Sequence, residues 1–239
     1  LSFFWRQIYW CLPGARVFLA QPPLFRVKSK KDTYYVQTDE EMKKQLLDKG
    51  LGDSEHNLRD SREISGTEMT KLCNVLADME EAITALERRG ISLRAHAQRR
   101  DGDGRLPIYH VFVGTQDKWF VNRADLDTFL AEQEQAAGKE LAVEETHSTD
   151  AAPAENGNGK PASQVHMTEL HEVKTINSGL SDLKKTFNFD IEVLIPQERT
   201  GSDEARFALR RGENETGLQD LRTLVGAVRD LGQKGLNVT

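Results

Sequence analysis

Residues Arg16–Lys31 read RVFLAQPPLFRVKSKK and decide more of the fold than any other stretch of the chain. The RVFLA run, Arg16–Ala20, is short and apolar, as expected of a strand. The two prolines that follow it end the strand, because neither has an N–H to donate to a ladder. Leu24–Val27 and Thr33–Val36 flank the polar sequence SKKD. This pattern predicts a β-hairpin with a lysine-rich tip.

The hairpin carries the one cluster in the sequence that looks like a binding site. Its members are all cations: Arg26, Lys28, Lys30 and Lys31. The first 36 residues hold six basic side chains and one acidic one, and since the whole chain has a net charge of -6, the rest carries -11. A basic end on an acidic body is compatible with contact to DNA phosphates at that end. The alternative is a solvated hairpin whose lysines discourage edge-to-edge aggregation, and spacing alone does not decide between the two.

Helical periodicity dominates the residues after the hairpin. A short helix is expected from Asp39 to Gly50, and the clearest helix of the chain runs from about Thr67 to Arg89. Ser65 and Glu68 have the spacing of a capping box at its start. The apolar residues of this helix recur every three or four positions and form one stripe: Met69, Leu72, Cys73, Leu76, Met79, Ile83 and Leu86.

The remaining elements indicate an α+β fold in two lobes. A hairpin made of Pro107–Val113 and Trp119–Val121 is followed by a helix that Asn122 caps. Residues from Ala136 to Gln164 are rich in Ala, Glu, Gly, Asn and Pro, which predicts a disordered linker. Four further segments complete the chain as helix, strand, strand and helix: Met167–Phe187, Asp190–Ile195, Arg206–Arg210 and Gly217–Leu231.

No catalytic or metal-binding constellation emerges from the sequence. Asp101–Gly104 reads DGDG, but the twelfth position of a calcium loop counted from Asp101 is Phe112 and not glutamate, so a polar turn is expected there. His166 and His171 are five residues apart, which places them off a common helical face and argues against a shared zinc ion. The glycines lack the context of a phosphate-binding loop.

The ends and the cysteines indicate a piece of a cytoplasmic protein. The chain opens at Leu1 inside an apolar run and closes at Thr239 inside GLNVT, which reads as the beginning of a strand. The opening segment lacks the basic lead and cleavage site of a signal peptide, and no apolar run approaches the roughly 20 residues that span a bilayer. Cys11 and Cys73 have no motif spacing, so free thiols in a reducing compartment are expected.

Two segments of the chain carry a resemblance to a known family. Phe3–Gln7 (FFWRQ) followed by Arg16–Val27 (RVFLAQPPLFRV) closely resembles the end of the Toprim domain in the B subunits of bacterial DNA gyrase, which continues into a lysine-rich hairpin. Lys234–Thr239 is similar to the strand that leads into the family's RYKGLGEM segment. The resemblance covers about residues 1–47 and, less strongly, 215–239. Between them lies a long segment that resembles the large insertion of many such subunits, and Glu68–Arg89 is similar to its long helix.

The sequence departs from the family in the turn before the strand. Tyr9–Pro13 replaces the usual polar helix end, and Arg16 stands where histidine is common. These changes affect the local packing that the resemblance implies for the turn and leave the family assignment in place.

The resemblance implies part of an ATP-hydrolysing type IIA topoisomerase that passes one DNA duplex through a transient double-strand break in another. It implies Mg²⁺ and ATP as cofactors of the parent enzyme. It implies double-stranded DNA and the A subunit of gyrase as partners, in an assembly of two A and two B subunits. The family's acidic metal-binding motifs and its ATPase domain precede the part that matches Leu1. No catalytic, metal or nucleotide residue is therefore assigned to this chain, and the chain alone is expected to be inactive.

These observations predict a domain plan of four parts. Residues 1–50 form the C-terminal end of a Toprim α/β domain with its hairpin, residues 51–138 and 166–239 form the two α+β lobes, and residues 139–165 form the disordered linker. Two other identities stay open. One is the B subunit of the related decatenating topoisomerase, against which the long insertion argues. The other is a non-catalytic module that binds DNA or protein.

Overall fold

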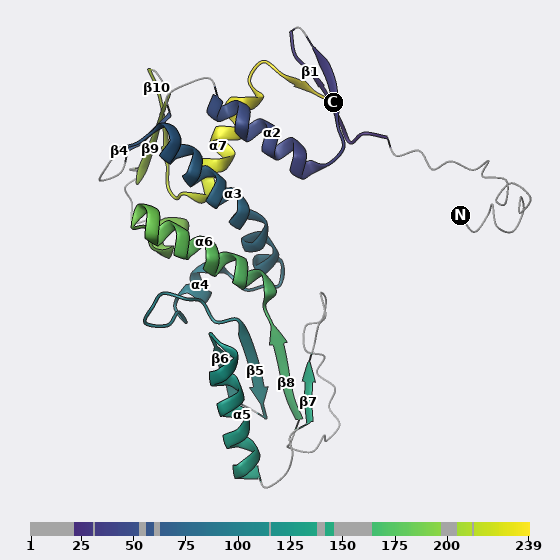
Figure 1. The fold of residues 1–239 in the computed structure, drawn as a ribbon, viewed down its shortest axis with the longest axis vertical. Coiled ribbons are helices and arrows are strands. Elements are labelled where there is room, and N and C mark those ends of the chain that lie inside the picture. Colours follow the sequence, from purple (N-terminus) through teal and green to yellow (C-terminus); the bar gives the residue numbers. More distant parts are fainter. Residues whose placement is uncertain are drawn as a thin grey trace, which may run out of the picture. The chain divides into compact units, whose positions relative to one another are not determined.

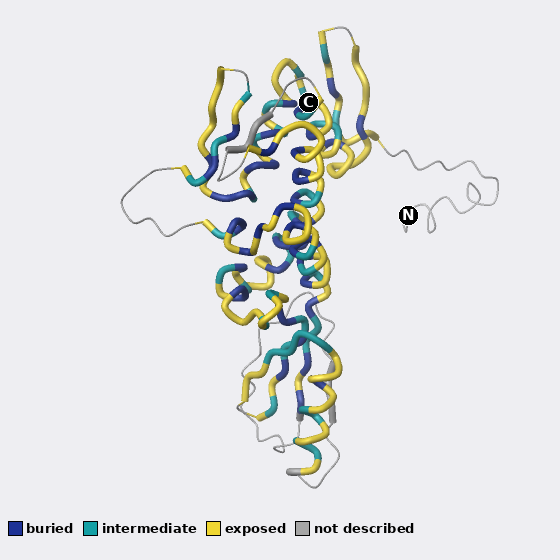
Figure 2. Tube along the Cα trace, turned by 60° about the vertical axis from the view of Figure 1, so that its left-hand side comes forward, coloured by how far each residue is buried: buried dark blue, intermediate teal, exposed yellow. Residues whose placement is uncertain are grey.

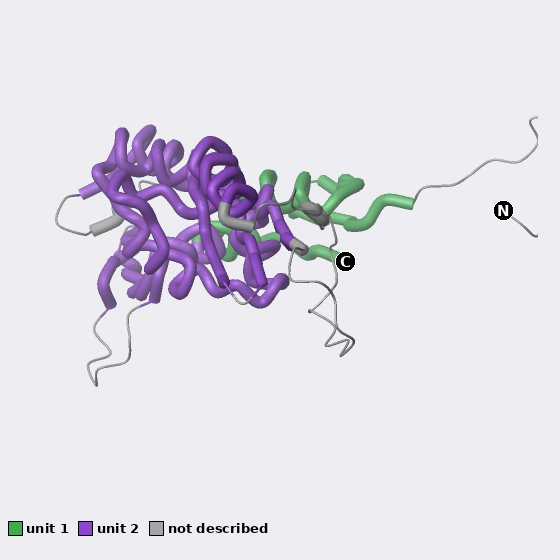
Figure 3. The backbone as a smooth tube through the Cα atoms, turned by 90° about the horizontal axis from the view of Figure 1, so that it is seen from below, with its two compact units in different colours: residues 1–53, 228–239 green, residues 54–227 purple. Residues whose placement is uncertain are grey.

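The computed structural model describes residues 22–30, 32–52, 56–59, 63–114, 116–137, 142–145, 164–196, 205–211 and 213–239. The predicted strand Arg16–Ala20, the segment before it, Cys11 and Lys31 lie outside these ranges. The chain divides into two compact units, residues 1–53 with 228–239 and residues 54–227 (Figure 3). Helices and three small sheets occur together, which confirms the α+β class (Figure 1). The four-part domain plan stays a prediction.

The first unit contains the predicted hairpin. Strands β1 (Phe25–Lys28) and β2 (Thr33–Val36) pair antiparallel, with Phe25 opposite Val36 and Lys28 opposite Thr33. The predicted C-terminal strand is confirmed as β11 (Asn237–Val238), which pairs with the other edge of β1. The sheet order is therefore β11-β1-β2, and we call this sheet A. Its buried residues pack with helix α2 (Asp39–Gly52) in a core formed by Val27, Val36 and Met42.

Glycines allow α2 to approach the C-terminal half of helix α7 (Arg222–Gln233) at backbone distance. A Cβ added at Gly50 of α2 would lie 2.2 Å from the carbonyl oxygen of Val228. A Cβ added at Gly232 of α7 would lie 2.1 Å from the carbonyl oxygen of Leu46. Real Cβ atoms do not approach other atoms this closely, so only glycine fits at either position without a shift of the backbone.

The second unit is built on two long helices, α3 (Gly66–Arg88) and α6 (His171–Phe187), which pack together through their apolar stripes. Figure 2 shows that buried, intermediate and exposed positions follow one another along the helices of the structure. The predicted α3 stripe is confirmed, since each of its apolar residues is buried. The capping box is wrong: Ser65 is the N-cap, but its side chain accepts no cap hydrogen bond. Arg89 Nε forms an ion pair with Glu172 Oε1 at 2.8 Å, which joins the end of α3 to the start of α6.

A four-stranded sheet with the order β10-β9-β3-β4 belongs to the same unit. Its strands are His56–Arg59 (β3), Glu63–Ile64 (β4), Phe207–Arg211 (β9) and Asn214–Leu218 (β10). The predicted helix from Gly217 is wrong at its start, because Gly217 pairs with Ala208 in this sheet and α7 begins at Arg222. The predicted strand Asp190–Ile195 is also wrong. Residues Ile191–Leu194 form a 3₁₀ helix (η2), in which the neighbours Val193 and Leu194 are both buried, as alternation along a strand would not allow.

The other four-stranded sheet, sheet C, has the order β6-β5-β8-β7. Its strands are Tyr109–Val113 (β5), Gln116–Phe120 (β6), Ala142–Glu145 (β7) and Gln164–Glu169 (β8), and helix α5 is Arg123–Ala137. Met167 was expected in a helix, but it lies in β8 opposite Val111, and α6 starts only at His171. The predicted disordered linker is wrong where β7 pairs parallel with β8, and residues 146–163 lie outside the described ranges. The short helix α4 (Leu93–Ala97) precedes this sheet.

Candidate nucleic-acid interface

The alternation of β1 separates a core face from an exposed basic face. Val27 points into the core and is fully buried, whereas Arg26 and Lys28 on either side of it are exposed. Side chains that neighbour each other in sequence point to opposite faces of a sheet, so the two cations share one face. Their partners on β2 are Tyr35 and Thr33, which are exposed on the same face. We call this surface the basic face of sheet A.

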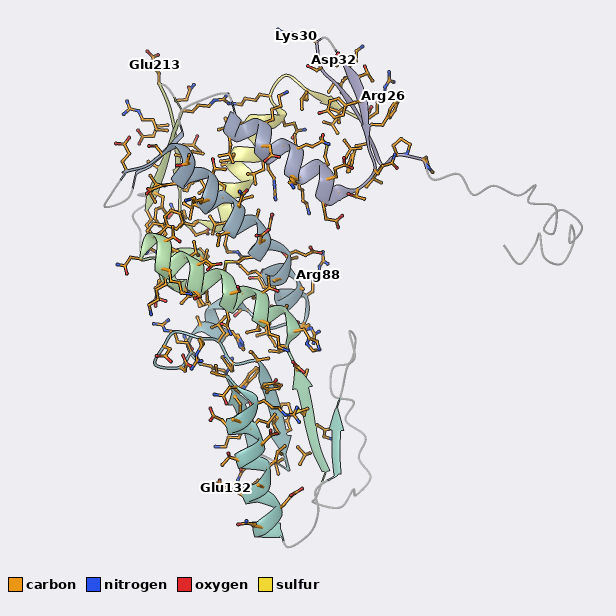
Figure 4. All side chains as sticks on the ribbon, in the orientation of Figure 1. Arg26, Lys30, Asp32, Arg88, Glu132 and Glu213 are labelled. Carbon is orange, nitrogen blue, oxygen red and sulfur yellow. The ribbon has the colours of Figure 1, made fainter. Side chains whose placement is uncertain are left out.

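The hairpin tip adds a third described cation. The tip closes with a hydrogen bond from the backbone N–H of Ser29 to the carbonyl oxygen of Asp32, at 2.8 Å. Lys30 is exposed beside Asp32, and Figure 4 labels both at the tip with Arg26 further down the strand. Lys31, the fourth predicted member of the cluster, lies outside the described residues. The structure thus brings Arg26, Lys28 and Lys30 together on one hairpin.

Both edges of β1 are hydrogen-bonded, which fixes the backbone beneath the cations. The N–H of Arg26 donates to the carbonyl oxygen of Thr239 at 2.7 Å, and the N–H of Thr239 donates to the carbonyl oxygen of Arg26 at 3.0 Å. On the other edge, Arg26 faces Tyr35 of β2. A fixed strand presents its side chains at regular spacing, and an extended row of cations suits a row of phosphates.

Sequence reasoning missed the apolar part of this surface. Tyr35 is 58% exposed and Leu24 is 59% exposed, and both lie among the largest exposed hydrophobic side chains of the described residues. The sequence contained this information. Tyr35 is next to Val36, which is buried, so it points to the opposite face, and Leu24 is two residues from Arg26, so it points to the same face as Arg26. The basic face therefore offers cations for phosphates together with apolar groups that can contact sugars or bases.

The DGDG segment forms the polar turn that the sequence predicted. Asp101 Oδ1 accepts hydrogen bonds from the N–H groups of Asp103 at 3.0 Å and Arg105 at 2.8 Å, and its Oδ2 accepts one from Arg105 Nε at 2.9 Å. Burial opposes ionisation of the Asp101 carboxyl, but the hydrogen bonds from Arg105 and Asp103 hold its pKa below the usual value. Within the described ranges, no group of three or more His, Cys, Asp or Glu side chains lies close enough to hold a metal ion.

A ring cluster between α4 and sheet C was also missed. His110 Nε2 lies 2.7 Å from Asp117 Oδ1, and its ring stacks on Trp119 with centroids 3.7 Å apart. His96 is fully buried, with its Nε2 2.9 Å from the carbonyl oxygen of Pro107. Desolvation lowers the pKa of both histidines, although the Asp117 carboxylate opposes this for His110 and the Pro107 carbonyl opposes it for His96.

Three further findings concern Cys73, the two histidines of the rejected zinc site, and the helices. Cys73 is buried and is not part of a disulfide in the described structure. His166 and His171 lie on different elements, β8 and the start of α6. None of the helices in the described part of the chain is both long and apolar enough to cross a membrane.

No protein-family model matches the chain, but individual curated proteins do. It is 35% identical to the DNA gyrase B subunit of Chlamydia muridarum over 46% of this chain and 14% of that protein. It is 26% identical to the DNA gyrase B subunit of Chlamydia pneumoniae over the whole chain and 26% of that protein. The type 2 topoisomerase B subunit of Aquifex aeolicus is 35% identical over 36% of the chain.

The chain spans about a quarter of the length of the Chlamydia pneumoniae protein that matches it throughout. The matches agree with the resemblance that FFWRQ and AQPPLFRV carried in the sequence, and one of them extends over both units of the structure. The similarity of this chain to B subunits of DNA gyrase and of type 2 topoisomerase is therefore confirmed.

Proposed function

We propose that the chain is part of the B subunit of an ATP-dependent type 2 topoisomerase of the gyrase kind, which supercoils DNA by duplex passage. Mg²⁺, ATP and an A subunit belong to this proposal as cofactors and partner of the complete cytoplasmic enzyme. The similarity to gyrase B subunits supports it, and so does the match over the whole chain length. The described residues of this chain supply no metal cluster. In this proposal the ATP-binding and cleavage chemistry belongs to other parts of the parent protein, as the family resemblance implies.

Within that enzyme, the basic face of sheet A contacts the phosphate backbone of duplex DNA. The observation that carries this role is the alternation of the fully buried Val27 with the exposed Arg26 and Lys28 on a strand paired on both edges. Residues 1–53 and 228–239 hold 11 basic and 7 acidic side chains, whereas residues 54–227 hold 21 basic and 31 acidic ones. The first unit is therefore the one suited to a polyanion, and the acidic second unit is suited to protein contact.

The salt dependence of binding to a fluorescein-labelled DNA duplex tests the DNA contact. Binding weakens as salt rises, and each cation that neutralises a phosphate makes the negative slope of log K against log salt steeper by about 0.9, so the slope below is given as its magnitude. Replacing Arg26, Lys28 and Lys30 by alanine should therefore lower the slope by about 2 to 3. The matched control is Lys185→Ala, an exposed lysine of α6 in the second unit, which should leave the slope unchanged. Equal effects of both changes would refute the proposed interface.

The enzyme class is tested on the complete B subunit mixed with its A partner, ATP, Mg²⁺ and relaxed plasmid. Accumulation of negative supercoils is the expected result. Decatenation without supercoiling would instead identify the decatenating relative. The absence of both activities would favour a binding module.

A further inference from the structure

The basic face of sheet A combines an exposed ring with cations that have no ion-pair partner. Tyr35 is 58% exposed and lies directly opposite Arg26 in the register of β1 and β2. Within the described ranges, Arg26, Lys28 and Lys30 form no ion pair, and the ring of Tyr35 contacts no other ring or cation. The strands of sheet A contain no acidic side chain, and Asp32 at the tip is the one carboxylate of the hairpin. The face therefore suits a ligand with both negative charge and flat apolar surface.

The register places the ring beside the guanidinium and next to a second apolar group. Because the N–H and the carbonyl oxygen of Arg26 both bond to Thr239, Arg26 and Tyr35 form a non-hydrogen-bonded pair, the closer of the two kinds of antiparallel pair. Leu24 lies on the same face, and its N–H donates to the carbonyl oxygen of Val36 at 3.0 Å, which holds it against β2. Arg26 thus lies against an apolar patch made of Tyr35 and Leu24.

An unpaired nucleic-acid strand offers the groups that this surface matches. Its phosphates suit the row of cations, and the flat face of a base suits an exposed aromatic ring. In a duplex each base face is covered by its neighbours in the stack, so Tyr35 can reach only sugars and groove edges. In an unpaired strand the base face is accessible, and stacking on an aromatic ring adds affinity whatever the base.

We propose that the basic face of sheet A is a binding site for an unpaired DNA strand, with the ring of Tyr35 stacked on a base and Arg26 on a neighbouring phosphate. Lys28 and Lys30 continue the row of cations along the backbone of the strand. This inference rests on the proposed contact of sheet A with DNA and adds the form of DNA that the surface recognises. Negative supercoiling favours strand separation, so the product of the proposed enzyme would contain such strands.

The probe is a fluorescein-labelled oligothymidylate of about 12 nucleotides, titrated with the full chain and followed by anisotropy, beside a duplex of equal length at the same salt concentration. Tyr35→Ile keeps apolar area and strand preference but removes the ring, so it should weaken oligothymidylate binding about ten-fold and duplex binding by less than about two-fold. Tyr35→Phe keeps the ring and should bind as the unchanged chain does. The matched control is Tyr34→Ile, next to it on the opposite face, which should leave both affinities within about two-fold.

An oligonucleotide of equal length with abasic sites in place of the bases separates stacking from charge. The unchanged chain should bind this strand about ten-fold more weakly than oligothymidylate, because the phosphates remain and the base faces are gone. Tyr35→Ile should cause no further loss on the abasic strand, since the ring then has no base to contact. A further loss of similar size would show that Tyr35 supports the sheet rather than stacks on a base.

Other outcomes would also overturn the proposal. Unchanged oligothymidylate binding by Tyr35→Ile, or an equal loss with Tyr34→Ile, would exclude stacking by Tyr35. Binding to phosphatidylserine vesicles that Tyr35→Ile abolishes, with no binding to oligothymidylate, would make a lipid surface the occupant. If the alanine variant at Arg26, Lys28 and Lys30 lowers the salt slope for the duplex while Tyr35→Ile changes nothing, the DNA contact stands and only the stacking fails. If that variant leaves every slope unchanged, the DNA contact itself fails.

Discussion

Replacing Gly232 by alanine should open the first unit of the structure selectively. The added Cβ would lie 2.1 Å from the carbonyl oxygen of Leu46 and 2.8 Å from the backbone nitrogen of Gly50. Both neighbours are backbone atoms of α2, so no side-chain rotation relieves the overlap and the helices must separate. Overpacking of this kind costs about 1–3 kcal/mol. We expect a loss of about 2 kcal/mol in the opening free energy of this unit.

Gly226 provides the matched control within the same helix. It is exposed, and a Cβ added there meets nothing within 4 Å. Gly226→Ala should therefore stabilise α7 by up to about 1 kcal/mol, the ordinary difference between the two residues in a helix. Each variant adds one Cβ atom to the same helix, and the two resulting changes in stability are expected to have opposite signs.

Hydrogen exchange followed by mass spectrometry measures the effect where it occurs. A loss of about 2 kcal/mol corresponds to exchange roughly 30-fold faster for protected amides of β1, β2 and α2. Peptides from α3 and α6 in the second unit should exchange as in the parent chain. If Gly232→Ala leaves the exchange of α2 unchanged, or behaves as Gly226→Ala does, the close helix contact does not exist in solution.

Two further predictions concern the second unit. A Cβ at Gly179 would lie 2.1 Å from Sδ of Met79, whose side chain is flexible, so Gly179→Ala should lower the free energy of unfolding by only about 1 kcal/mol. In a double-mutant cycle followed by urea unfolding, Met79→Ala should destabilise the Gly179→Ala chain less than it destabilises the parent chain. Strict additivity of the two changes would contradict the contact. The lowered pKa of the buried His96 means that the unfolded chain gains the proton first, so stability should fall as the pH drops below the ordinary value of 6.5. His96→Gln, which can still donate to the Pro107 carbonyl, should flatten the pH dependence of the unfolding free energy between about pH 7.5 and 5.5. The control His171→Gln, at an exposed position, should leave this dependence as it is in the parent chain. If the parent and both variants show the same slope of unfolding free energy against pH, His96 is not the group responsible.

Local periodicity explains which elements the sequence predicted correctly. The 3.6-residue stripe of α3 and the hairpin of β1 and β2 depend on residues that are close in sequence, and both predictions were confirmed. Asn122 capped α5 as expected, with its Oδ1 accepting from the N–H of Asp125. The basic cluster of the hairpin was predicted from sequence for the same reason, since Arg26 and Lys28 are two residues apart.

The incorrect predictions share a different cause. Asp190–Ile195 has the apolar content of a strand, but Leu221 donates from its N–H to the carbonyl of Val193 and η2 takes the place of a strand pairing. Met167 fits the helical stripe of α6 by spacing, yet pairing with Val111 of β5 draws it into a strand. In both segments a partner distant in sequence decided the structure, and no local pattern reports such a partner.

The sequence by itself determined the α+β class, the long helices, the basic hairpin and the similarity to gyrase B subunits, because these depend on short-range periodicity and on contiguous motifs. Only the tertiary structure decided that Arg26 is held between β2 and Thr239. It also decided that α2 and α7 meet at glycines and that the rings of β5 and β6 form one row capped by Arg99. These features join residues far apart in the chain, and their geometry follows from strand register and helix packing rather than from local sequence.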